Sequence, residues 1–256
     1  MRIVEKGKWA ALLALVGLLL APSAHSDVVT TISGTHNLLD YASADLLEGW
    51  LGEGELAFTN IFTKAPGDNS IDFHAAADGA GPTFSLIEIL DANGEMLQVI
   101  GGYNPQSWAS NDVWNLTLND ADRTAFIFNL TDDTPRVFYQ KPTTFSDGWR
   151  GQYQTGNLSN YGPIFGLGPD LFVTGDLNMG HTFSWSYGAD GVSGFFATVS
   201  EINAYFTVGQ IEVFTFAPSV SEVAVAPVPV PAAAGLGLLG MGLVSALRRR
   251  KKTVRV

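Results

Sequence analysis

Short apolar segments, separated by turns that contain glycine or asparagine, run through the middle of this 256-residue chain. The clearest pair is Thr83–Leu90 and Met96–Ile100, joined by a turn in which Gly94 suits a positive φ angle. Segments with the same strand-like pattern lie at Leu56–Thr63, Ala125–Leu130, Arg136–Gln140, Asp170–Thr174, Thr182–Tyr187 and Gln210–Phe216. Many short strands of this kind pair into antiparallel sheets, which bury their apolar faces by packing on one another. The pattern therefore predicts a β sandwich.

Two segments near the start of this region have helical spacing instead. The first begins near Ser43 and stops at Gly52, and the second is capped by Ser70 and closed by Gly79. We therefore expect an α+β chain that is mostly β, with two antiparallel sheets packed as a sandwich and a few flanking helices.

Charge is distributed unevenly along the chain. Residues 27–226 hold 24 acidic and 5 basic residues, so their net formal charge is −19. Such a surface repels phosphate backbones, and we expect no nucleic-acid partner. A solvated surface explains the charge, and binding of divalent cations is the alternative. The chain has no Cys, which excludes a disulfide framework and thiolate metal sites.

The N-terminal residues have the three parts of a secretory signal. A basic segment, Met1–Lys8, precedes the apolar run Trp9–Ala21, and the small residues Ala24 and Ser26 stand at positions −3 and −1 before Asp27. This order predicts a signal peptide at residues 1–26. An uncleaved anchor helix is the alternative, although the apolar run is short for one.

The C-terminal residues also have three parts. A linker with a proline-spaced end covers residues 218–231, an uncharged apolar segment covers 232–247, and a basic tail covers 248–256. Sixteen helical residues would span about 24 Å, slightly less than a bilayer core. We expect residues 232–247 to cross a membrane, with the basic tail in the cytoplasm and residues 27–217 outside as one domain.

The order of these parts is specific. The residues that define it are Val228, Pro229, Pro231 and Ala232, followed by Arg248, Arg249 and Arg250. This tail resembles the PEP-CTERM family of sorting signals, in the variant named for Val-Pro-Leu-Pro-Ala, with Val230 in place of Leu. The resemblance implies a Gram-negative bacterium whose exosortase processes the tail and passes the protein toward the cell surface, outer membrane or extracellular matrix. An ordinary stop-transfer anchor would have the same topology.

Six further motifs follow one another in the middle region. They are residues 73–83 (FHAAADGAGPT), Gly101-Gly102-Tyr103, Ser107-Trp108, residues 125–130 (AFIFNL), residues 161–171 (YGPIFGLGPDL) and Ile211-Glu212-Val213-Phe214. This ordered set resembles the TLDc domain of eukaryotic oxidation-resistance proteins over roughly residues 37–216. The resemblance implies two antiparallel sheets packed as a sandwich with helices outside.

The TLDc resemblance has limits for function. Eukaryotic members act in oxidative-stress protection and bind the vacuolar proton pump, but an exported bacterial protein meets no such pump. Many members carry Cys before the Asp-Gly pair, where this chain has Ala77. Thiol-based chemistry is therefore excluded here.

Four residues of these motifs form a candidate binding patch, namely Asp78, Tyr103, Trp108 and Glu212. Glu212 lies in an apolar strand, so its carboxylate needs a partner such as a backbone N–H. Gly101 and Gly102 leave room for an aromatic ring over the backbone. The stretches 103–108 and 149–153 mix rings with amides and hydroxyls, as glycan sites require. The alternative for all these residues is maintenance of the fold.

No catalytic residue, metal site or cofactor is predicted. His36, His74 and His181 lack metal-ligand spacing, and no nucleophile elbow or phosphate-binding loop is present. Paired carboxylates remain an option for a glycosidase, at Glu53/Glu55, Asp120/Asp122 and Asp132/Asp133.

The favoured function is an exported, non-catalytic TLDc-like interaction module, processed by exosortase and binding polysaccharide or a surface protein. The alternatives are a hydrolase of matrix glycans that uses paired carboxylates, and a protective factor against oxidative stress.

Overall fold

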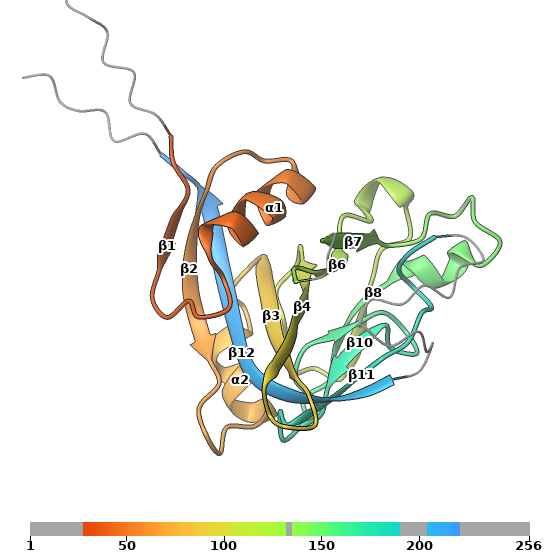
Figure 1. Cartoon of the computed structure of the whole chain (residues 1–256). Coiled ribbons are helices and arrows are strands. Elements are labelled where there is room, and N and C mark those ends of the chain that lie inside the picture. The colour runs from red at the N-terminus through yellow and green to blue at the C-terminus, as the bar shows by residue number, and fades with distance from the viewer. Residues whose placement is uncertain (1–27, 132–134, 190–203, 221–256) are drawn as a thin grey trace, which may run out of the picture. The chain divides into compact units, whose positions relative to one another are not determined.

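Twelve strands dominate the computed structural model, which describes residues 28–131, 135–189 and 204–220 (Figure 1). In chain order they are β1 (Thr31–Ser33), β2 (Leu56–Thr63), β3 (Thr83–Leu90), β4 (Met96–Asn104), β5 (Val113–Leu116), β6 (Phe126–Asn129), β7 (Arg136–Tyr139), β8 (Tyr153–Asn157), β9 (Ile164–Phe165), β10 (Leu171–Val173), β11 (Met179–Thr182) and β12 (Ala204–Pro218). Two α-helices accompany them, α1 (Tyr41–Leu51) and α2 (Ser70–Ala77). The described residues belong to one compact unit, Val28–Val220.

The expectation of two separate sheets is wrong in its connectivity. The described strands form one hydrogen-bonded sheet in the order β5-β8-β9-β10-β11-β12-β3-β4-β6-β7, with β2 also on β12 and β1 on β2. All pairs are antiparallel except β1 with β2. The cause is the 15-residue β12, which pairs first with β11 and then with both β3 and β2 (Figure 1). It therefore connects the strands from β5 to β11 with the strands from β3 to β7 in one sheet.

Packing nevertheless has the layers of a sandwich, because the central strands bury both faces. Phe84 and Leu86 of β3 enter a core that α1 covers with Leu47. Ile87 and Ile89 of the same strand enter a second core, which contains side chains from α2, β9 and β10. Alternate residues of one strand thus fill two cores.

Both helices were predicted with small errors at their ends. Asp40 caps α1 by accepting from the Ser43 N–H, and Gly52 ends it in the left-handed conformation. Asn69, not Ser70, caps α2, because Asn69 and Asp72 form a reciprocal capping box.

The predicted strands at Leu56–Thr63 and Thr83–Leu90 are confirmed, whereas Thr182–Tyr187 is wrong. The observed strand β11 ends at Thr182. Beyond it, the backbone N–H groups of residues 185–187 bind the Asp170 carboxylate instead of a neighbouring strand.

Residues 1–27 and 221–256, which carry the predicted signal peptide, proline motif, membrane segment and basic tail, lie outside the described residues. In the part of the chain that the structure describes, no helix is long and apolar enough to cross a membrane.

Candidate functional site

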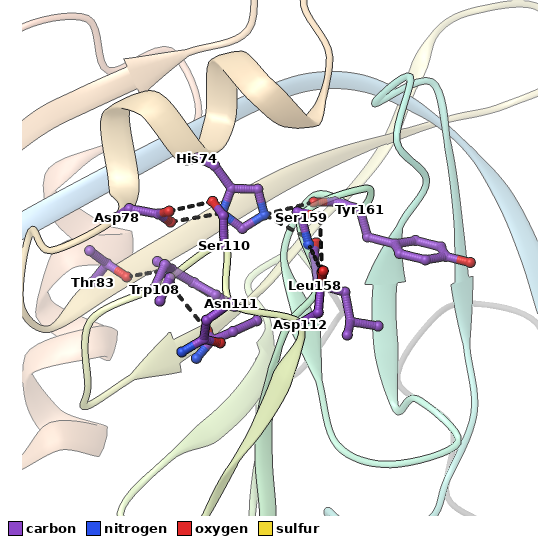
Figure 2. Close-up of polar contacts among 12 residues, drawn as sticks. His74, Asp78, Thr83, Trp108, Ser110, Asn111, Asp112, Leu158, Ser159 and Tyr161 are labelled. Atoms are coloured by element: carbon purple, nitrogen blue, oxygen red, sulfur yellow. Dashed lines mark hydrogen bonds and ion pairs between the residues drawn. The ribbon is translucent and has the colours of Figure 1, made fainter.

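A polar cluster lies where α2 ends and the loop after β4 passes beside it. Figure 2 shows Asp78 bonded on one side to His74 and on the other to Ser110. His74 Nδ1 is 2.7 Å from Asp78 Oδ1, and the Ser110 hydroxyl donates to Asp78 Oδ2. The His74 side chain is buried, whereas 30% of the Asp78 side chain is exposed. Asp78 and Ser110 are thus the members of this cluster that face solvent.

The other ring nitrogen of His74 is held by backbone groups. His74 Nε2 lies 3.2 Å from the Leu158 carbonyl oxygen and 3.1 Å from that of Tyr161 (Figure 2). A carbonyl oxygen only accepts, so Nε2 carries a hydrogen and cannot serve as a base there. The Ser110 hydroxyl donates to Asp78 rather than to His74. The three residues therefore lack the relay from serine to histidine that activates a nucleophile.

A hollow of about 460 Å³ opens over this cluster, lined by Ile71, His74, Ala75, Asp78, Ser110 and Ser159. Beside it, Asp112 has a φ of 57° and accepts from both the N–H and the hydroxyl of Ser159. These bonds lower the pKa of Asp112. The rim of the hollow is therefore acidic, and the bonds between Asp112 and Ser159 connect it to the turn between β8 and β9.

Trp108 and Tyr103, two residues of the candidate patch, are buried. Trp108 is 1% exposed, and its indole N–H donates to Thr83 Oγ1 over 2.9 Å (Figure 2). Its backbone pairs with that of Asp78, so these two residues are neighbours. Tyr103 packs in the core on the α1 side, where burial raises its pKa to about 12.

Glu212 is also buried and binds the backbone, as its place in an apolar strand predicted. Its carboxylate accepts from the N–H groups of Asn37 and Leu38, 2.8 and 3.1 Å away. Burial raises its pKa. Because Tyr103, Trp108 and Glu212 are buried, the four patch residues do not share an exposed surface.

The predicted room for an aromatic ring over the backbone at the glycines of β4 is confirmed, and two further glycines shape the turn after α2. Gly79 and Gly81 have φ angles of 72° and 85° in the turn after α2. An added Cβ at Gly102 would lie 2.5 Å from the Phe165 ring, so the ring does occupy the space over the backbone.

In each carboxylate pair that the structure describes, at least one carboxylate accepts hydrogen bonds from the protein. Glu55 accepts from the N–H and hydroxyl of Thr30. Asp120 accepts from Thr143, which lowers the pKa of Asp120, whereas a glycosidase acid needs a raised one. The pair Asp132/Asp133 lies outside the described residues.

Asp170 is a site that sequence reasoning missed. This fully buried carboxylate accepts from the consecutive N–H groups of Trp185, Ser186 and Tyr187 at 2.7 to 3.0 Å. Burial raises its pKa to about 7, against the opposing effect of these bonds. The available signal was an acid placed directly between a Gly-Pro turn and an apolar segment.

A second missed feature is a row of rings across the part of the sheet from β5 to β12. It consists of Trp114 on β5, Phe172 on β10, His181 on β11 and Tyr205 on β12, with Tyr161 packed on Phe172. We call these five residues the aromatic row. Nothing local in the sequence joins them, because they come from four strands and a turn.

The family model of the TLDc domain matches residues 55–217 of the chain. No curated protein matches it.

Proposed function

Because the chain belongs to the TLDc domain family, we propose that it is an exported, non-catalytic TLDc-family interaction module. We propose further that exosortase sorts it to the cell surface, outer membrane or extracellular matrix of a Gram-negative bacterium. Its partners there would be a polysaccharide or a surface protein.

The observation that carries the non-catalytic part is the internal bonding of the polar cluster. Both ring nitrogens of His74 and both carboxylate oxygens of Asp78 already have protein partners. The two carboxyls with raised pKa values, Asp170 and Glu212, are buried and bind backbone N–H groups. These arrangements stabilise the fold and leave these groups engaged, so binding is favoured over catalysis.

Support for export comes from the two ends of the sequence. Ala24 and Ser26 suit a signal peptidase, and residues 228–232 suit an exosortase. The net formal charge of −19 in residues 27–226 suits a protein that stays soluble outside the membrane.

Export is tested by expressing the full chain in a Gram-negative host with and without an exosortase, followed by cell fractionation and mass spectrometry. We expect loss of residues 1–26 in both strains and loss of the C-terminal tail only with the exosortase. The double variant P229A/P231A should keep its tail, whereas the matched control Pro227→Ala should lose it. A full-length chain in the cytoplasm would contradict the proposal.

The same purified protein tests the two alternatives. Incubation with matrix polysaccharide should leave the polymer length unchanged, and shortening would favour a hydrolase. Survival of peroxide-treated cells should not depend on the protein, and a dependence would favour the protective factor.

A further inference from the structure

The four strand residues of the aromatic row lie on one register line across the sheet, and Tyr161 packs beside them from a turn. Phe172 is paired directly with His181, and His181 with Tyr205. In the other direction Phe172 is paired with Ile164, and Trp114 with Gly156. The residues beside Phe172 in its strand, Leu171 and Val173, point into the core, so Phe172 points out.

Gly156 lets the row continue to β5. A Cβ at this position would lie 3.0 Å from the Trp114 ring and 3.2 Å from Ile164 Cγ2. Because the glycine has no side chain, the Trp114 ring lies over β8 toward Ile164. Trp114, Tyr161 and Phe172 then line one small hollow of about 150 Å³, together with Leu158, Ile164 and Pro169.

Three of the rings, those of Phe172, His181 and Tyr205, lie on neighbouring strands. The ring centres of Phe172 and His181 are 5.5 Å apart, and those of His181 and Tyr205 are 4.4 Å apart. Five steps between six neighbouring strands, from β5 to β12, cover about 24 Å. The Tyr161 ring points away from the His74 cluster (Figure 2) and packs edge-on against Phe172. A ligand on this line therefore meets an elongated surface on which Tyr205 is exposed, Trp114, Tyr161 and Phe172 are half-buried, and His181 is 6% exposed between Phe172 and Tyr205.

From this geometry we infer that the aromatic row binds a neutral polysaccharide chain, laid across the strands with its sugar rings against the side-chain rings. Aromatic faces bind apolar surface while leaving polar groups at the ring edges free for solvent, which suits a sugar ring with its hydroxyls at the edge. The row contains no Lys, Arg, Asp or Glu. The net formal charge of −19 in residues 27–226 repels anionic polymers, so the favoured ligand carries no acidic sugar.

This inference rests on the proposed function and names the ligand class of the interaction module. Sedimentation of the full chain, in non-ionic detergent, with insoluble neutral glycans tests it. The probes are cellulose, mannan, xylan, chitin and curdlan, and alginate beads are the anionic comparison. We expect saturable binding to at least one neutral glycan and none to alginate.

Two substitutions at the ends of the row locate the binding face. Tyr205 is 73% exposed and Trp114 lies on an edge strand, so Ala at either position leaves the cores intact. Each single variant should weaken binding about tenfold, and the double variant should abolish it. Tyr205→Trp, which keeps a ring, should bind like the original chain. The matched control is Tyr41→Ala, because Tyr41 is a ring on α1, outside the row, with 59% exposure.

Thermal unfolding followed by circular dichroism confirms that each variant is folded. Binding that persists in W114A/Y205A, or that Tyr41→Ala weakens equally, would overturn the role of the row while leaving the interaction module standing. Absence of binding to all five neutral glycans would overturn the inference, while the export experiment judges the proposed function separately. A change of oligomeric state in the row variants, without glycan binding, would instead assign this face to a second copy of the chain.

Discussion

Asp170 accepts the hydrogen bonds that the backbone N–H groups of residues 185–187 would otherwise donate to a neighbouring strand. Three successive N–H groups converge on its carboxylate, and the chain therefore leaves the sheet after β11. We expect Asp170→Asn to lower the free energy of unfolding by about 1–3 kcal/mol, because the amide NH₂ cannot accept from these donors. Urea unfolding at pH 8 measures this. Asp45→Asn, on the exposed face of α1, is the matched control and should change little.

The same carboxyl makes stability depend on pH. Burial raises the pKa of Asp170 to about 7, whereas the unfolded value is near 4. Between these two values the folded chain binds a proton that the unfolded chain has released, so this group increases the free energy of unfolding as pH falls from 8 to 5. We expect the profile of Asp170→Asn against pH to lack this increase. Parallel profiles for the two proteins would show that Asp170 does not titrate in this range.

At the scale of elements, β4 requires glycine at two consecutive positions, Gly101 and Gly102, because neither position has room for a side chain. A Cβ at Gly101 would lie 2.0 Å from the Ser85 carbonyl oxygen, and one at Gly102 would lie 2.5 Å from the Phe165 ring. The Ser85 carbonyl is held in place by the pairing of β3 with β4, and the Phe165 ring is held in place by the core. We therefore expect Gly101→Ala and Gly102→Ala to destabilise the fold by about 1–3 kcal/mol or more.

Gly49 on α1 is the control for these two variants. A Cβ there meets nothing within 4 Å, so Gly49→Ala should be neutral or stabilising by up to about 1 kcal/mol. The midpoint of urea unfolding distinguishes them. A midpoint for Gly101→Ala equal to that of Gly49→Ala would mean that β3 and β4 can separate without cost.

Strands with their own apolar pattern could be predicted from the sequence. β2 and β3 match their expected bounds because their residues favour strands whatever their neighbours are. β8 (Tyr-Gln-Thr-Gly-Asn) has no such pattern and is a strand because β5 and β9 pair with it. A strand can therefore be predicted when its own residues favour it, and it is missed when only its pairing with distant strands makes it a strand.

The same distinction applies to the candidate sites. Sequence reasoning identified Asp78, Trp108 and Glu212 as important, and it correctly required a hydrogen-bonding partner for Glu212. It could not tell a buried ring from an exposed one, because exposure depends on long-range packing. Contacts such as that between His74 and the Tyr161 carbonyl join residues 87 positions apart. The aromatic row depends on such pairings throughout.

At the scale of the whole molecule, the fold depends on its last described strand. β12 pairs with β11, β3 and β2, so its removal leaves one edge of each of these strands unpaired and separates the three from one another. We expect a chain that ends at residue 203 to show no cooperative thermal transition, whereas one that ends at residue 220 should unfold like the full chain. Circular dichroism and limited proteolysis measure this. A cooperative transition in the shorter chain would show that the remaining strands fold without β12.

The position of β12 also sets an order in time. Synthesis and translocation both proceed from the N-terminus, so the strand that belongs in the middle of the sheet is the last part of the domain to emerge. Until residue 218 is free, β2 and β3 have no shared neighbour, and the distant pairings of β12 with these strands cannot be completed. A translocation channel that admits only extended chains would thus receive this domain before it has folded, and folding would be completed on the far side of the membrane.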